Sequence, residues 1–231
     1  AERNCAITGS LVIKANGDYF NRMVFVFPSG DVQFYDKRHL FALAGEDKLY
    51  GGTGNDTLSY INAINTVDNK GVLVKLSSDS DDASKGMASG IDGNDQLWDF
   101  ENVIGSNYDD TIYGNGLSNS LWGEAGDDTI YGDAGNDTIF SGTGSDYIDG
   151  GADTNTVDYT DVHNSSNVRV NLSTSNQTLS GTTTNTMTGA TSAMTDTLSN
   201  IQNVNTGAGN DTIWGSTTKN VIDSGAGDDI I

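Results

Sequence analysis

The chain has 231 residues, of which 32 are acidic and 11 are basic, and its formal net charge is −21 at pH 7. This acidity argues against nucleic acid or an anionic membrane as a partner and favours bound cations or a strongly hydrated surface. A single cysteine excludes an internal disulfide bond, and no apolar run is long enough to suggest membrane insertion.

Residues 1–48 differ in pattern from the rest of the chain. Apolar runs predict strands over 6–13, over 21–27 and in a third segment that ends at Tyr35. This part closely resembles an internal stretch of the nitrilase (carbon–nitrogen hydrolase) superfamily, and its YDKRHLF run matches the family's lysine motif. The resemblance places Lys37 at the position of the catalytic lysine. That chemistry also needs a glutamate base and a cysteine nucleophile, and no cysteine follows Lys37. We therefore expect no hydrolysis by this chain alone, and expect Lys37 to be non-functional here.

From residue 42 onward the chain contains short glycine turns followed by apolar triplets. Residues 42–50 form a degenerate nine-residue block, and residues 51–59 form a fuller one with Asp56 at its sixth place. The alternating Val72, Val74 and Leu76 predict a half-buried strand, and the polar segment 77–92 predicts a loop. A further block is predicted at 90–98, with Asp95 at the sixth place.

Residues 105–158 are six consecutive nine-residue blocks with no insertion or deletion between them. Each block has a glycine-rich turn, an acid or amide at the sixth place and an aliphatic residue at the eighth. A fixed short period predicts a stacked architecture in which each repeat contacts its neighbours. The eighth-place residues are expected to point inward and form a narrow core, and the ninth-place aromatics are expected to face outward. The turn glycines expected to adopt positive φ are Gly123, Gly126, Gly132, Gly135, Gly142 and Gly144.

The sixth place carries Asp110, Asp128, Asp137 and Asp146, with Asn119 and Asn155 in the other two blocks. Stacking would bring carboxylates of successive coils to the strand spacing of about 4.8 Å. Two like charges at that separation repel by roughly 3–4 kcal/mol at an effective dielectric constant near 20. A bound cation would remove this repulsion, and Ca²⁺ prefers the carboxylate and carbonyl oxygens that such turns offer.

The blocks resemble the RTX (hemolysin-type) calcium-binding repeat, G-G-x-G-x-D-x-U-x. The resemblance implies an all-β fold, a right-handed parallel β-roll (β-solenoid) with two blocks per coil, and several Ca²⁺ ions held between turns two blocks apart. It favours the pairs Asp110 with Asp128 and Asp128 with Asp146, whereas Asp137 has an asparagine at each neighbouring site. The predicted calcium-site residues are Asp56, Gly105, Asp110, Gly123, Gly126, Asp128, Gly132, Gly135, Asp137, Gly142, Gly144, Asp146, Gly209, Asp211, Gly227 and Asp229.

A longer duplication surrounds the blocks. Asp95-Gln-Leu-Trp-Asp-Phe-Glu-Asn-Val103 recurs as Asp196-Thr-Leu-Ser-Asn-Ile-Gln-Asn-Val204, and the strand at 71–77 recurs at 167–173. The polar segment 173–195 predicts a second loop. We therefore expect a nitrilase-like fragment at 1–48 and a β-roll at 49–231, the latter built from modules at about 51–150 and 151–231. The chain starts without Met and stops inside a block, so we expect it to be part of a longer protein.

The leading functional hypothesis is calcium binding, coupled to folding, in a secreted extracellular bacterial protein. The family resemblance implies type I secretion machinery as a partner of the parent protein. The alternatives are a carbon–nitrogen hydrolase chimera with an RTX tail and a structural repeat of a large RTX adhesin. Self-association or a cell-surface partner is left open by the outward aromatic residues.

Overall fold

The structure is a computed structural model. It describes residues 6–8, 23–26, 32–35, 47–51, 54–63, 70–77, 86–90, 93–160, 167–172, 182–185 and 194–231. Every regular element in these ranges is a β-strand, so they contain no helix that could cross a membrane. The chain divides into two compact units, Ala1–Asp47 and Lys48–Ile231.

The first unit contains a small antiparallel sheet. Its strands are β1 (Ala6–Thr8), β2 (Met23–Val26) and β3 (Val32–Tyr35), in the order β1-β2-β3. Each lies within one of the three segments that the sequence predicts to be strands. Lys37 lies outside the described residues, so the predicted lysine site has no structural description.

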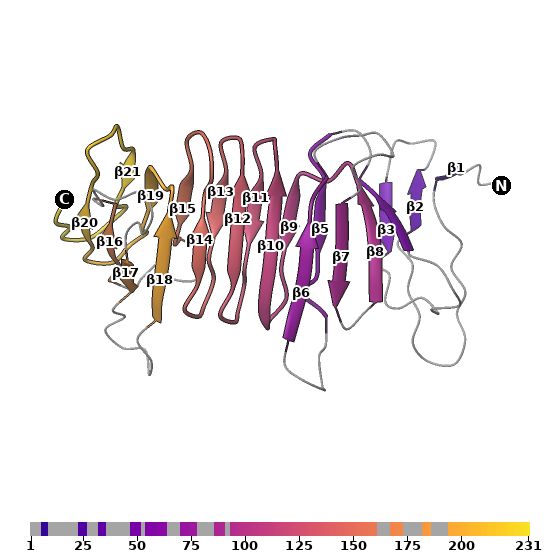
Figure 1. Ribbon diagram of the computed structural model, residues 1–231, viewed down its shortest axis with the longest axis horizontal. Helices are drawn as coiled ribbons and strands as arrows, with labels where there is room; N and C mark the ends of the chain where they lie inside the picture. The colour runs from indigo at the N-terminus through magenta and orange to yellow at the C-terminus, as the bar shows by residue number, and fades with distance from the viewer. Residues whose placement is uncertain are drawn as a thin grey trace. The chain divides into compact units, whose positions relative to one another are not determined.

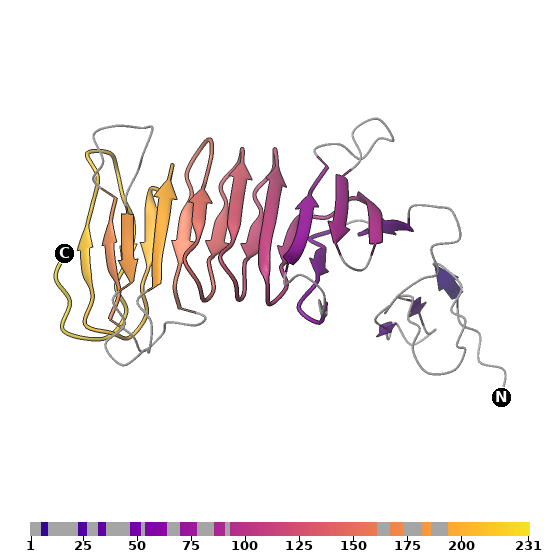
Figure 2. The ribbon, with the colours of Figure 1, turned by 60° about the horizontal axis from the view of Figure 1, so that its bottom comes forward.

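The second unit is built on two long sheets, whose strands stack side by side along the unit (Figures 1 and 2). The nine-stranded sheet has the order β17 (Thr182–Asn185), β18 (Met194–Ser199), β14 (Tyr147–Asp149), β12 (Thr129–Asp133), β10 (Asp109–Asn115), β6 (Lys70–Lys75), β7 (Gly86–Gly90), β8 (Gly93–Trp98) and β4 (Asp47–Tyr50). The seven-stranded sheet has the order β21 (Ile222–Asp223), β19 (Asn203–Asn205), β15 (Thr156–Asp158), β13 (Thr138–Phe140), β11 (Ser120–Trp122), β9 (Asn102–Ile104) and β5 (Thr57–Ser59). A two-stranded sheet pairs β16 (Arg169–Asn171) with β20 (Thr212–Trp214).

The nine-residue period explains why the chain alternates between the two long sheets. Successive blocks contribute strands to opposite sheets, so each strand pairs in parallel with the strand two blocks away. Ile112 lies opposite Ile130 in one sheet, and Leu121 lies opposite Ile139 in the other. This arrangement confirms the predicted parallel β-roll with two blocks per coil.

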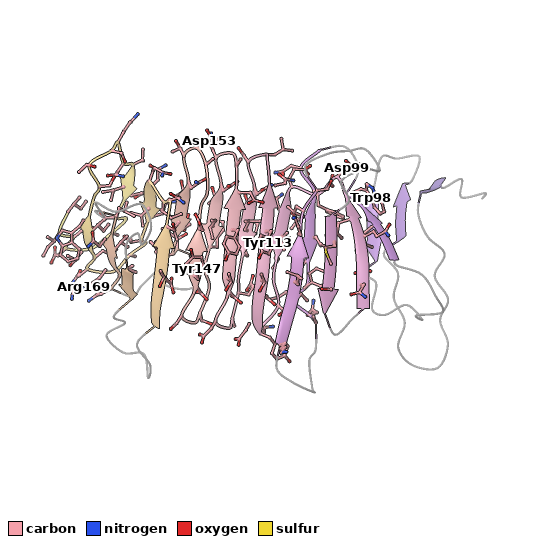
Figure 3. The ribbon with its side chains drawn as sticks, viewed as in Figure 1. Trp98, Asp99, Tyr113, Tyr147, Asp153 and Arg169 are labelled. Atoms are coloured by element: carbon pink, nitrogen blue, oxygen red, sulfur yellow. The ribbon has the colours of Figure 1, made fainter. Side chains whose placement is uncertain are left out.

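The core is a ladder of eighth-place side chains, as the period predicts. These residues have no solvent exposure and are Ile112, Leu121, Ile130, Ile139, Ile148 and Val157. The ninth-place aromatics form stacked pairs on both sheets, with ring centroids 4.7 Å apart in Tyr113–Tyr131 and in Trp122–Phe140. These four rings are half-buried, and Tyr113 lies over the nine-stranded sheet in Figure 3 beside Tyr147, an exposed seventh-place residue.

The predicted loops at 77–92 and 173–195 are wrong in part. Residues 86–90 form β7, which pairs antiparallel with both β6 and β8, and residues 182–185 form β17, which pairs antiparallel with β18. Ser-, Thr- and Gly-rich composition favours loops, but pairing with a neighbouring strand overrides that local preference. The predicted block at 90–98 is also wrong. Its first six residues should form a glycine turn, but β8 begins at Gly93 and runs through the second half of that turn.

Candidate metal centre

The sixth-place carboxylates form a hydrogen-bonded ladder along one edge of the roll. The Asp110 N–H donates to Asp128 Oδ1 and the Asp128 N–H donates to Asp146 Oδ1, both at 2.8 Å. On the opposite edge, the Asn119 N–H donates to Asp137 Oδ1 at 2.8 Å. All of these partners are 18 residues apart in sequence, so the two-block coil itself brings the acidic side chains together.

Each of three buried carboxylates in this ladder retains one oxygen without a hydrogen-bond partner. These atoms are the Oδ2 atoms of Asp128, Asp137 and Asp146, and the three residues are at most 2% exposed. A buried ionised oxygen without a donor is costly unless it is paired or coordinates a metal. The described turns therefore present three carboxylate oxygens that need a cation or a proton.

First-place glycines leave the spaces into which two of these oxygens point, whereas the block of Asp146 begins with the buried Ser141. A Cβ added at Gly123 would overlap Asp128 Oδ2 and the Ser141 carbonyl oxygen. A Cβ added at Gly132 would likewise overlap Asp137 Oδ2 and would lie 2.7 Å from the Gly150 carbonyl oxygen. Each space thus brings together a carboxylate oxygen and a carbonyl oxygen, which are ligands that Ca²⁺ prefers.

The prediction that all six turn glycines adopt positive φ is wrong for two of them. Positive φ is found at Gly126, Gly135, Gly142 and Gly144, as the turn chemistry predicts, but not at Gly123 or Gly132. At Gly123 and Gly132 glycine is needed because a side chain would fill the oxygen-lined space. Sequence alone could not separate these two reasons, because both give glycine.

At the asparagine turns an amide group fills the same space, with its nitrogen at Gly150 and with its oxygen at Gly114, where an added Cβ would overlap Asn119 Oδ1. At Gly150 the added Cβ would meet the Asn155 side-chain nitrogen at 2.7 Å and the Asn200 carbonyl oxygen at 2.6 Å. Asn155 Nδ2 donates to that carbonyl at 3.2 Å. The amides of Asn119 and Asn220 also donate across one coil, to the carbonyls of Glu101 at 2.7 Å and Gln202 at 2.6 Å. An amide at the sixth place can thus donate to a carbonyl of the neighbouring coil without a metal ion, and an ionised aspartate cannot.

The first aspartate of each array is satisfied by the protein. Asp110 Oδ1 accepts hydrogen bonds from the Val72 N–H at 2.6 Å and the Ser106 hydroxyl at 2.7 Å. In the second module, Asp211 Oδ1 accepts from the Val168 N–H at 2.8 Å, and its other oxygen accepts from the Thr206 hydroxyl. The duplication seen in the sequence therefore extends to the hydrogen bonds that begin each array.

The predicted residues separate into three groups in the structure. Asp128, Asp137 and Asp146 present open oxygens, and half-buried Asp56 also has an Oδ2 atom without a partner. Asp110 and Asp211 are engaged by protein donors, whereas Asp229 Oδ1 accepts the Asp211 N–H at 2.9 Å. The remaining predicted residues are turn glycines: Gly105, Gly123, Gly126, Gly132, Gly135, Gly142, Gly144, Gly209 and Gly227. Among the described residues, no three His, Cys, Asp or Glu side chains form a metal-binding group by themselves, so backbone carbonyls would have to complete each site.

Burial strongly perturbs these carboxyl groups. Loss of solvent raises the pKa of Asp128 to about 8 and that of Asp137 to about 6, and neighbouring carboxylates add to both shifts. The pKa values of Asp146 and Asp196 are also raised, first by burial and, for Asp146, next by the charge of Asp196. Without a cation, the folded roll therefore favours the protonated form of these acids.

The raised pKa values predict an unusual pH dependence of the metal-free protein. Because the folded state holds protons that the unfolded chain releases near pH 4, stability is greatest in acid and falls as the pH rises from about 4 through 8. We expect chelator-treated protein to show more strand signal in circular dichroism, and a higher melting temperature, at pH 5 than at pH 8.5. Equal or greater stability at pH 8.5 would contradict this interpretation of the buried acids.

The fold and the turns define a class: a parallel β-roll with acidic, calcium-type turns along its edges. The model of the RTX calcium-binding nonapeptide repeat matches the chain in four stretches, at residues 39–60, 104–139, 134–161 and 200–231. The chain therefore contains RTX calcium-binding repeats, as the sequence pattern predicts.

A second comparison finds partial similarity to two curated proteins. Over 47 residues the chain is 45% identical to the Omega-amidase YafV of Escherichia coli strain K12 and 43% identical to that of strain B / BL21-DE3. The match covers 20% of this chain and 18% of each relative. The chain thus spans less than a fifth of the curated relatives it matches. This partial similarity agrees with the nitrilase-like fragment predicted from the sequence.

Proposed function

We propose that residues 49–231 form a calcium-dependent folding module of a secreted bacterial protein. The observation that carries this proposal is the set of buried Oδ2 atoms of Asp128, Asp137 and Asp146, which have no hydrogen-bond partner. Ca²⁺ would be held by these oxygens together with turn carbonyls, and it would supply the positive charge that the stacked carboxylates need. Extracellular calcium modules typically bind with a Kd of about 10⁻⁴ to 10⁻³ M, so the sites would fill outside the cell and stay empty at cytosolic calcium.

Binding and folding are coupled because the oxygen-lined spaces exist only when the coils are stacked. A ligand that binds only the folded state stabilises it by about 2.7 kcal/mol per site when its concentration is 100 times Kd. Several such sites would shift a weakly stable chain from unfolded to folded over a narrow calcium range. The proposal includes type I secretion of the parent protein, which would travel unfolded and fold after release.

A calcium titration of the metal-stripped protein tests the proposal. Circular dichroism should show the strand signal appearing with calcium, and calorimetry should show binding and folding heat at the same concentrations. Magnesium is the control, because its preference for near-ideal octahedral geometry suits these carbonyl-rich turns poorly. A metal-stripped sample that remains compact and melts cooperatively at pH 8 would overturn the proposal.

Amide or nitrile hydrolysis is not proposed for this chain. The similarity to the amidase favours an evolutionary link of the first unit to that superfamily, but covalent catalysis requires nucleophile, base and oxyanion donors within mutual reach. The matching lysine motif supplies only Lys37, and no cysteine follows it.

A further inference from the structure

The acidic ladder continues beyond the last aspartate of the first array. Strand β18, which begins 45 residues after β14 ends, pairs with it in parallel and places Leu198 opposite Ile148. The Asp146 N–H donates to Asp196 Oδ1 at 3.1 Å, which repeats the contact that joins Asp110, Asp128 and Asp146. Asp196 therefore occupies the next position of the ladder, although it lies outside the stretches that match the RTX repeat.

The junction between the two arrays buries both carboxylates. Asp146 is 2% exposed and Asp196 is 1% exposed. Asp146 Oδ1 accepts the Asp128 N–H, and Asp146 Oδ2 has no partner, so the open oxygen belongs to the residue that contacts Asp196. The buried Tyr159 and Ser141 side chains lie beside Asp196, and their hydroxyl groups partly offset the rise in its pKa that burial causes.

We propose that Asp146 and Asp196 together bind a calcium ion at the junction between the first and second modules. The inference rests on the proposed calcium-dependent folding, but it concerns a residue outside the nonapeptide pattern. Two buried like charges on adjacent strands oppose the β14–β18 pairing, and a divalent cation reverses that repulsion. The ion would therefore act as the link through which the first array holds the start of the second.

The consequence is a calcium dependence that differs along the chain. Strands β10 and β12 depend on the turn sites of the first array, whereas β18 and β19 depend also on the junction. Loss of the junction ion should leave the first array folded and weaken the second. A site within one array would not have this selective effect.

The test compares Asp196→Asn with Asp153→Asn by calcium calorimetry. Asparagine keeps an oxygen to accept the Asp146 N–H, and its amide can replace a cation as it does at Asn155. Asp153 is exposed on a turn (Figure 3), so its variant makes the same change of charge away from the junction. We expect Asp196→Asn to bind one ion fewer than the wild type and Asp153→Asn to bind the same number.

Hydrogen exchange supplies a second measurement. In the wild type, the amides of β18 and β19 should gain protection only at or above the calcium concentrations that protect β10 and β12. In Asp196→Asn, whose amide needs no ion at the junction, β18 and β19 should gain protection at several-fold lower calcium than in the wild type. Unchanged ion number in Asp196→Asn overturns the inference, provided that the wild type binds calcium. A wild type that binds no calcium overturns the proposed function as well.

If Asp196→Asn does not reach the wild-type circular dichroism spectrum in saturating calcium, the variant has not folded. The test is then X-ray diffraction from crystals of the wild-type protein soaked in terbium, which takes the place of calcium. An anomalous peak between the two carboxylates supports the junction site. Peaks beside Asp128 and Asp137 with none between Asp146 and Asp196 overturn it.

Discussion

Replacing Asp137 by asparagine should make the roll less dependent on calcium while removing one binding site. Asp137 lies on the edge where its neighbours in the ladder are Asn119 and Asn155. Its Oδ2 shares the space at Gly132 with the Gly150 carbonyl, just as Asn155 Nδ2 shares the space at Gly150 with the Asn200 carbonyl. The amide of an asparagine at 137 can therefore donate to the Gly150 carbonyl, where aspartate presents a second acceptor.

The size of this effect follows from the pKa of Asp137. Burial raises that pKa from 3.8 to about 6, so the ionised carboxyl destabilises the metal-free folded state at pH 8 by at most about 3 kcal/mol, and solvent screening at the turn lowers this value. Asp137→Asn should remove this penalty, raise the unfolding free energy in chelator by up to that amount and lower the calcium needed for half-folding. Chemical denaturation in chelator at pH 8 measures the first effect, and calorimetry measures the lost ion.

Asp137→Ala is the control that separates loss of the charge from gain of the amide donor. Alanine also removes the charge, but it supplies neither the acceptor for the Asn119 N–H nor a donor for the Gly150 carbonyl. We expect this variant to be less stable than Asp137→Asn in chelator and in calcium alike. If both variants behave identically, the amide does not replace the cation.

The sequence predicts the roll well because its physical determinants are local and periodic. Ile112, Ile130 and Ile148 recur at a fixed interval, and a parallel pairing two blocks apart places them one above another in the core. The same interval predicts that Asp110, Asp128 and Asp146 stack on one edge. The spacing of the blocks is set by the local sequence, so the core and the row of aspartates can be predicted without knowing how distant segments pair.

The sequence does not predict the parts that depend on distant pairing or on atomic contacts. Strand β7 has a loop-like composition and forms because β6 and β8 flank it. The long duplication aligns Asp196 with the sixth-place Asp95, but Asp196 joins the ladder only through the pairing of β18 with β14, which no repeat period specifies. The engagement of Asp110 by Ser106 and Val72 is likewise invisible in the pattern, since Asp110 and Asp128 occupy identical places in their blocks.

Gly123→Ala should abolish one calcium site and destabilise the calcium-bound roll by about 1–3 kcal/mol or more, as overpacking of a buried space does. The added methyl group would overlap Asp128 Oδ2 and the Ser141 carbonyl oxygen, and it would lie 3.2 Å from Asp128 Cγ. The backbone at Gly123 is not in the left-handed region, so alanine introduces no conformational strain of its own. The loss would therefore come from filling the oxygen-lined space. Calorimetry measures the ion number, and thermal melting in saturating calcium measures the stability.

Gly116→Ala is the matched control, because the two glycines differ in surroundings and not in backbone class. Gly116 is exposed, its φ is not positive, and an added Cβ meets no atom within 4 Å. Alanine there should leave the ion number unchanged and raise the stability slightly, by about 0.4–1 kcal/mol, since it restricts the unfolded chain. Equal losses in the two variants would mean that glycine serves chain flexibility at both positions and that the space beside Asp128 holds no ion. A loss confined to Gly123→Ala would instead tie the glycine at this position to the cation, because φ alone would allow a side chain there.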